Sequence, residues 1–158
     1  MSGSGPTSAA DASAARAFVV NSLAARAQSV GEIERKLAER GIPSDVAETV
    51  IDDAVRLGYL DDAELAGQLA RGFRGRRYGR RRAAMAMRRR MLDAAAVETA
   101  IDDAYADADE AALALDALGA RALNDAADHR RAVAFLLRRG FSSDAARRAV
   151  RAHGDAPR

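Results

Sequence analysis

Residues 40–54 read RGIPSDVAETVIDDA, and residues 90–104, fifty positions further along, read RMLDAAAVETAIDDA. The two segments align without a gap. A third copy follows at an offset of 99 from the first, where residues 139–150 read RGFSSDAARRAV. Self-similarity with a period of roughly 20 to 50 residues is typical of proteins built from stacked units. The sequence therefore predicts three structural units, each about fifty residues long.

Residues typical of helix starts and helix ends recur in each unit, and no alternating strand pattern occurs. Ser29 and Glu32 form a capping box at the start of one helix, and Gly41 can end that helix in the left-handed conformation. Ser44 can cap the next helix. We expect an all-α chain with helices at 12–27, 30–40, 44–57, 61–74, 79–90, 94–105, 108–122, 126–139 and 143–152.

The apolar positions recur in the same register as the repeat. Ile33 superposes on Ala83 and Ala132, and Leu37 follows Ile33 by one turn on the same helix face. Forty alanines dominate the 49% of residues that are hydrophobic, so each core is small. The predicted fold is an elongated, curved array of three tandem three-helix repeats, in which each unit contacts mainly its neighbours.

The repeat register also predicts the domain boundaries. The three units are expected at 12–58, 59–106 and 107–153, between a flexible leader at 1–11 and a flexible C-terminus at 154–158. Within them, the apolar stripe places Leu57 in the first core, and Tyr59 and Tyr105 are expected to pack at unit ends.

The composition excludes several classes of function. The chain has no cysteine for a disulfide or a thiolate metal site, and its two histidines lack a zinc-binding spacing. No apolar run approaches the roughly 20 residues of a membrane span, and the N-terminus is no signal peptide. The paired aspartates are interpreted as structural or solvent-facing. We expect a cytoplasmic protein with no catalytic site, metal or cofactor.

Charge is strongly segregated, although the net charge is only +2. Residues 65–92 hold ten arginines and no acidic residue. Residues 93–128 hold ten acidic residues and one arginine, and residues 129–158 hold eight arginines and two acidic residues. Ten arginines without a local carboxylate indicate a contact surface rather than an ordinary solvated helix face.

Basic helices at equivalent places in neighbouring units would form a stripe, which suits a long polyanion. If that ligand is single- or double-stranded DNA, we expect contacts to phosphates with a steep dependence on salt. Tyr78 either packs beneath the arginine side chains or belongs to the contact surface. The candidate surface comprises Arg71, Arg74, Arg76, Arg77, Tyr78, Arg80, Arg81, Arg82, Arg88, Arg89, Arg130, Arg131, Arg138, Arg139, Arg147 and Arg148.

Four motifs in fixed order carry a resemblance to a known family. They read SVGEIERKLAERG at 29–41, LGYLDDAELA at 57–66, YGRRR at 78–82 and FLLRRGFS at 135–142. Over residues 14–153 the chain resembles the RecX family, the bacterial regulatory proteins of the RecA recombinase.

The resemblance implies an elongated, all-helical, non-enzymatic modulator without a cofactor. Members of the family bind RecA filaments along the helical groove and inhibit filament growth, ATP hydrolysis, strand exchange and coprotease activity, and so modulate recombination, repair and the SOS response. Affinity for DNA within the family agrees with the basic stripe. Leu65, Met91, Ala83 and Ala132 depart from the family pattern and predict looser packing in units two and three.

Two alternatives stay open on the sequence alone. One is a general DNA- or RNA-binding helical repeat protein that has no recombinase partner. The other is a scaffold whose acidic residues 93–128 recruit a basic partner. We expect a monomer in each case.

Overall fold

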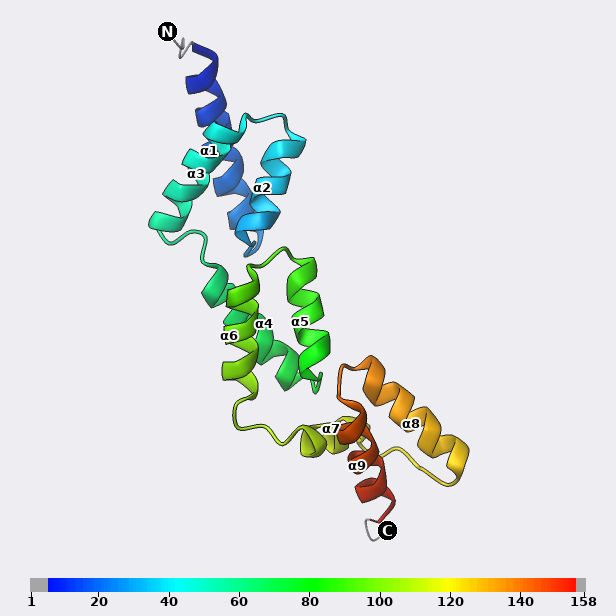
Figure 1. Cartoon of the computed structure of the whole chain (residues 1–158). Coiled ribbons are helices and arrows are strands. Elements are labelled where there is room, and N and C mark those ends of the chain that lie inside the picture. The colour runs from blue at the N-terminus through cyan, green and yellow to red at the C-terminus, as the bar shows by residue number, and fades with distance from the viewer. Residues whose placement is uncertain (1–5, 156–158) are drawn as a thin grey trace.

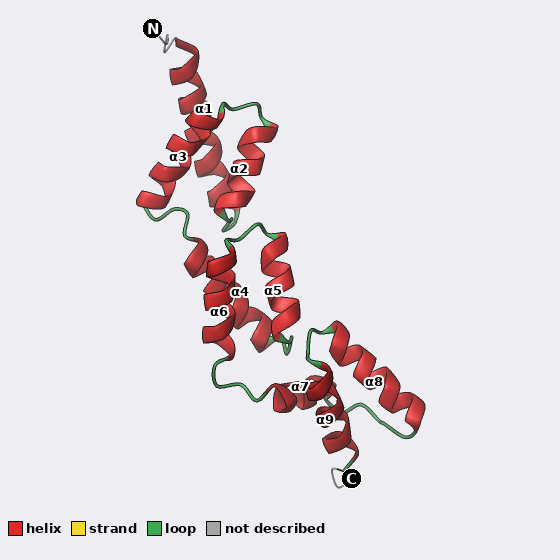
Figure 2. Cartoon of the chain, viewed as in Figure 1, coloured by secondary structure: helices red, strands yellow, loops and turns green. Residues whose placement is uncertain are grey.

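The protein is described by a computed structural model that covers residues 6–155. Residues 1–5 and 156–158, with those parts of the expected leader and C-terminus, lie outside the described residues. The described part contains nine helices and no strand, which confirms the all-α prediction (Figures 1 and 2). The helices are α1 (Pro6–Ala25), α2 (Val30–Glu39), α3 (Ser44–Arg56), α4 (Asp62–Gly75), α5 (Arg80–Arg89), α6 (Ala94–Tyr105), α7 (Glu110–Leu118), α8 (Ala126–Arg138) and α9 (Ser143–Gly154).

The helices form three successive groups of three in an elongated array, with the two ends of the chain far apart (Figure 1). Helices α1–α3 bury a core around Ile33. Helices α4–α6 bury a second core around Met87, and α7–α9 bury a third around Leu136. The prediction of three tandem three-helix repeats is therefore confirmed.

Several helix ends differ from the sequence expectation. Helix α1 begins at Pro6, so the prediction of a flexible leader is wrong for residues 6–11, which are helical. Helix α7 ends at Leu118 instead of residue 122, because Gly119 takes a φ of +58° and stops it. Helix α9 continues to Gly154. Ser44 is not a cap, since it is the first residue of α3 and no side-chain bond caps that helix.

Of the two tyrosines predicted to pack at unit ends, one is buried and the other is exposed. Tyr105 is only 2% exposed, as expected. Tyr59 is 66% exposed and Leu57 is 60% exposed, so the prediction that these two residues pack in the interior is wrong. Helix α3 ends at Arg56, before the turn that carries both residues, and the apolar helical stripe therefore does not extend to them.

The middle helices α2, α5 and α8 lie on the right-hand side of their respective groups in Figure 1, with α8 displaced and tilted relative to the other two. The C-terminal turn of α5 docks on the N-terminus of α2, where the Ser29 hydroxyl donates to the Arg90 carbonyl at 2.5 Å. The C-terminal turn of α8 docks in the same way on α5, where the Gly79 amide donates to the Arg139 carbonyl at 2.9 Å. The two basic helices are thereby brought end to end.

The turns at these junctions share one backbone conformation. Gly41 and Gly140 have φ values of +72° and +91°, and Met91 occupies the equivalent place with a φ of +56°. Met91 therefore adopts a left-handed backbone conformation, which glycine adopts at a lower energetic cost than other residues. The Met91 turn lies so close to unit 1 that a Cβ on Gly31 would come within 2.7 Å of the Met91 Cβ.

Candidate nucleic-acid interface

Helix α5 presents a set of unpaired arginines to solvent. Its buried side rests on Ala83, and Arg81, Arg82, Arg88 and Arg89 are exposed. Residues seven apart lie nearly above one another on a helix, which aligns Arg81 with Arg88 and Arg82 with Arg89. None of these four arginines forms an ion pair with any residue that the structure describes. Their charges are therefore available to an anion from outside the chain.

An open groove of about 670 Å³ lies between α5 and α6. Met85, which contributes to its lining, is 47% exposed, so the groove offers apolar surface as well as charge. Guanidinium groups bind phosphates and carboxylates through paired hydrogen bonds, which makes this groove a candidate site for an anionic ligand. The full lining is Arg80, Arg81, Arg88 and Arg89 with Ala84, Met85 and Ile101.

Arg80 differs from its neighbours because it fastens α5 to α6. Its guanidinium bonds to the Asp102 carboxylate and to the Tyr105 carbonyl, both at 3.1 Å. Burial raises the pKa of Tyr105 to about 12, against the opposing charges of Arg74 and Arg80. The Tyr105 hydroxyl therefore stays protonated and donates to the Tyr78 carbonyl at 2.8 Å, which ties the loop before α5 to α6.

Several predicted contact residues at the end of α4 have partners within the chain. Arg74 pairs with Asp107 at 2.8 Å, and its guanidinium holds the pKa of that carboxyl below the ordinary value. Arg77 pairs with Asp116. Arg71 lies 3.7 Å from Glu64.

These pairs give the acidic segment 93–128 an internal role. Asp102, Asp107 and Asp116 all face arginines of the preceding basic block, so part of the segment neutralises its own chain. The scaffold alternative needs those carboxylates for a partner, and the pairing weakens that alternative.

Tyr78 packs beneath an arginine side chain. The Arg139 guanidinium lies 4.0 Å from the centre of the Tyr78 ring, and Phe73 meets that ring edge-on at 5.6 Å. Arg76 lies over Phe73 at 4.9 Å. Arg139 also donates to the carbonyls of Arg76 and Arg77, so it belongs to the junction between units two and three.

Unit 3 extends the basic surface. Arg130 and Arg138 on α8 and Arg147 on α9 are exposed and form no ion pair with the described residues. Arg131 pairs with Asp128, one turn away. Arg148 reaches Asp144 at 3.3 Å and Asp109 at 3.5 Å. The available charge in unit 3 is therefore concentrated on three of the five arginines predicted for α8 and α9 outside the junction.

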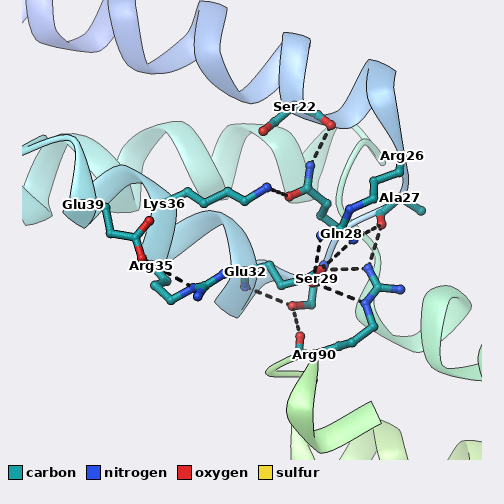
Figure 3. A network of polar contacts seen from close by, with 10 residues as sticks. All are labelled: Ser22, Arg26, Ala27, Gln28, Ser29, Glu32, Arg35, Lys36, Glu39 and Arg90. Atoms are coloured by element: carbon teal, nitrogen blue, oxygen red, sulfur yellow. Dashed lines mark hydrogen bonds and ion pairs between the residues drawn. The ribbon is translucent and has the colours of Figure 1, made fainter. Parts of the chain in front are cut away.

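Two residues that sequence reasoning did not select hold units one and two together (Figure 3). Glu32 is 7% exposed and accepts hydrogen bonds from Arg90 at 2.8 Å and Arg26 at 3.1 Å. Arg90 also donates to the Ala27 carbonyl at 2.8 Å. The capping box at Ser29 gave a local role to Glu32, but the partner at residue 90 is visible only in three dimensions.

The pKa of Glu32 makes the first junction sensitive to acid. Burial would raise this pKa, but hydrogen bonds from Arg90, Arg26 and the Ser29 amide outweigh burial and lower it to about 2. A carboxyl whose folded pKa is depressed stabilises the fold above its unfolded pKa and loses that contribution as the pH falls. We expect Glu32 to contribute about 3 kcal/mol at neutral pH, lost progressively as the pH falls from about 5 through about 2.

Urea unfolding across that pH range, on the wild type and on Glu32→Gln, measures this contribution. We expect the variant to be less stable at pH 7 and to lose less of its unfolding free energy as the pH falls from 5 to 2. Glu34→Gln is the matched control, because Glu34 is exposed on the same helix. If Glu32→Gln lost as much unfolding free energy in acid as the wild type does, the role of this carboxylate would be contradicted.

Other kinds of site find no support in the described residues. They contain no group of three or more His, Asp or Glu side chains placed to hold a metal ion. None of the described helices has the length and hydropathy needed to cross a membrane.

Comparison with protein families and known proteins identifies relatives of the chain. Residues 15–53 match the family model of the first three-helix domain of RecX, and residues 110–150 match that of the third. Regulatory protein RecX of Mycolicibacterium vanbaalenii is 34% identical over 139 residues, which cover 81% of this chain and 76% of that protein. Regulatory protein RecX of Mycobacterium marinum is 35% identical over 138 residues, which cover 84% and 80%.

Solved structures share the fold. The crystal structure of RecX from Lactobacillus salivarius superposes with a TM-score of 0.77 at 17% identity, covering 92% of this chain and 98% of that one. A second crystal structure, of a regulatory protein RecX, gives a TM-score of 0.73 at 19% identity and covers 95% of this chain and 74% of that one.

Proposed function

The chain belongs to the RecX family, and from that premise we propose that it regulates the RecA recombinase by binding RecA filaments assembled on DNA. Binding inhibits filament growth, ATP hydrolysis and coprotease activity, and so modulates recombination, repair and the SOS response. The protein acts as a cytoplasmic monomer that binds and does not catalyse, and it needs no cofactor.

The observation that carries this proposal is the row of unpaired arginines on α5, extended by those of α8. The C-terminal turn of α8 docks on the N-terminus of α5, so the arginines of the two units lie on adjoining helices. A filament assembled on DNA presents repeating phosphates and repeating protein subunits, and an extended set of arginines can contact several repeats at once. An isolated anion would need only one of these arginines.

The experiment that tests the proposal is ATP hydrolysis by RecA on single-stranded DNA, with this protein titrated at fixed moderate salt. We expect inhibition at concentrations far below those that coat the DNA, because a filament modulator acts on RecA rather than by covering the strand. Inhibition only at saturation of the DNA would contradict the proposal and support the general nucleic-acid-binding alternative, in which the protein merely competes for the strand.

A further inference from the structure

The turn between α3 and α4 displays large apolar side chains to solvent. Leu57 is 60% exposed, Tyr59 is 66% exposed and the neighbouring Val55 is 46% exposed. Contiguous exposed apolar residues in a folded monomer mark interaction sites more often than single ones do. We call Leu57 and Tyr59 together the apolar turn.

The apolar turn is held in a fixed shape. The Leu57 amide donates to the Asp53 carbonyl at 3.0 Å, and the Tyr59 amide donates to the Ala54 carbonyl at 2.8 Å. Leu60, at 1% exposure, anchors the end of the turn in the first core. A side chain displayed on an ordered backbone loses little conformational entropy on binding, which favours its use as a contact.

The fold itself does not require apolar residues in this turn. At an offset of fifty residues, the turn between units two and three carries Asp107 and Asp109 at the places of Leu57 and Tyr59. Asp107 pairs with Arg74, and Asp109 caps α7. The connection between units two and three, residues 106–109, therefore carries no large apolar side chain. A connection between units does not require such side chains, and the exposure of Leu57 and Tyr59 needs another explanation.

The charge around the apolar turn selects the kind of partner. Asp52 and Asp61 lie within a few residues of it and form no ion pair with the described residues, whereas Asp53 is paired with Arg16 and Arg56. Phosphates are repelled by such surroundings, whereas a positively charged protein surface is attracted. The turn also lies at the left of the array in Figure 1, while the arginine-bearing α5 and α8 lie at the right.

We propose that Leu57 and Tyr59 insert into an apolar pocket with a basic rim on the protein component of the filament. The inference rests on the proposed function, because the filament supplies the partner. The molecule then uses two separate surfaces, one of arginines for anionic groups and one apolar for a protein pocket. Tyrosine is enriched among the residues that dominate binding energy at protein interfaces.

The test is binding of Leu57→Ala/Tyr59→Ala to RecA filaments on single-stranded DNA. We expect affinity to fall by about tenfold or more, since truncating a residue that dominates an interface has effects of that size. The loss should persist from low to high salt, because an apolar contact is not screened. Affinity for naked single-stranded DNA should be unchanged. Tyr59→Ala alone provides a second variant with a smaller perturbation.

Val20→Ala is the matched control, because Val20 is 60% exposed on α1, outside the turn, and its truncation should change nothing. Wild-type affinity in the folded double variant would overturn the inference and leave the proposed function standing. An equal loss of affinity for naked DNA would also overturn it, because the turn would then contact nucleic acid. Failure of the wild-type chain to bind filaments would contradict the proposed function itself.

Discussion

Replacing Arg81, Arg88 and Arg89 with glutamine is expected to weaken binding to RecA filaments by about 100-fold near 0.1 M salt. All three side chains are exposed on α5, line the groove against α6 and form no ion pair with the described residues. Glutamine removes the charge and leaves the core of unit 2 intact. Binding measured across a range of salt concentrations should give a salt slope that is lower by about one for each lost phosphate contact.

The matched control neutralises Arg16, Arg35 and Arg40 in unit 1. These arginines are exposed and lie away from the apolar turn in the sequence, so the control makes the same change in net charge in another unit. We expect it to retain at least most of the affinity. Equal losses in the two triple variants would show that net charge, rather than the α5 surface, governs binding. Arg80 is left unchanged, because its bonds to Asp102 and Tyr105 support the fold.

Replacing Gly140 with alanine is expected to break the junction between units two and three. Gly140 has a φ of +91°, and a Cβ there would overlap the Arg82 backbone nitrogen and lie 2.9 Å from the Arg82 Cα. Backbone cannot move aside as a flexible side chain can, so overlap and left-handed strain together should cost about 3 kcal/mol. Urea unfolding measures the loss, and small-angle X-ray scattering reports whether unit 3 separates from unit 2.

Gly41→Ala separates the two causes of that loss. Gly41 occupies the same turn in unit 1 with a φ of +72°, but a Cβ there meets nothing within 4 Å. Only the left-handed strain remains, and we expect it to cost about 1 kcal/mol. If Gly140→Ala were no more destabilising than Gly41→Ala, the close docking of α8 on α5 would not be present in solution.

The repeat and most of its helices could be predicted from the sequence because their signals are local. The capping box at Ser29 and the helix-ending Gly41 each act within a few residues. The errors at helix ends also have local causes: Gly119 ends α7 at Leu118, before the expected residue 122, and Ser44 is the first residue of α3 rather than its cap. Equivalent positions in the repeat then placed the buried Ala83 and Ala132 correctly.

Only the local excess of arginine at the candidate site could be predicted from the sequence. The charge count identified the basic block, but it gave Arg77 and Arg81 equal weight. Arg77 is paired with Asp116, 39 residues away, whereas Arg81 has no such partner in the described chain. That distinction depends on how α4, α5 and α7 pack, which no short-range pattern encodes. The role of Arg90 could not be predicted for the same reason, since its partner Glu32 lies 58 residues away in the sequence.

The docking of one middle helix on the next also sets an order of assembly during synthesis. The N-terminus of α2 receives its partner, the Arg90 turn, only after 61 further residues have been made. Until then Glu32 has Arg26 as its one basic partner within the first unit. Units one and two are therefore each completed by the unit translated after them, and a nascent chain released before residue 90 leaves the first junction without its partner.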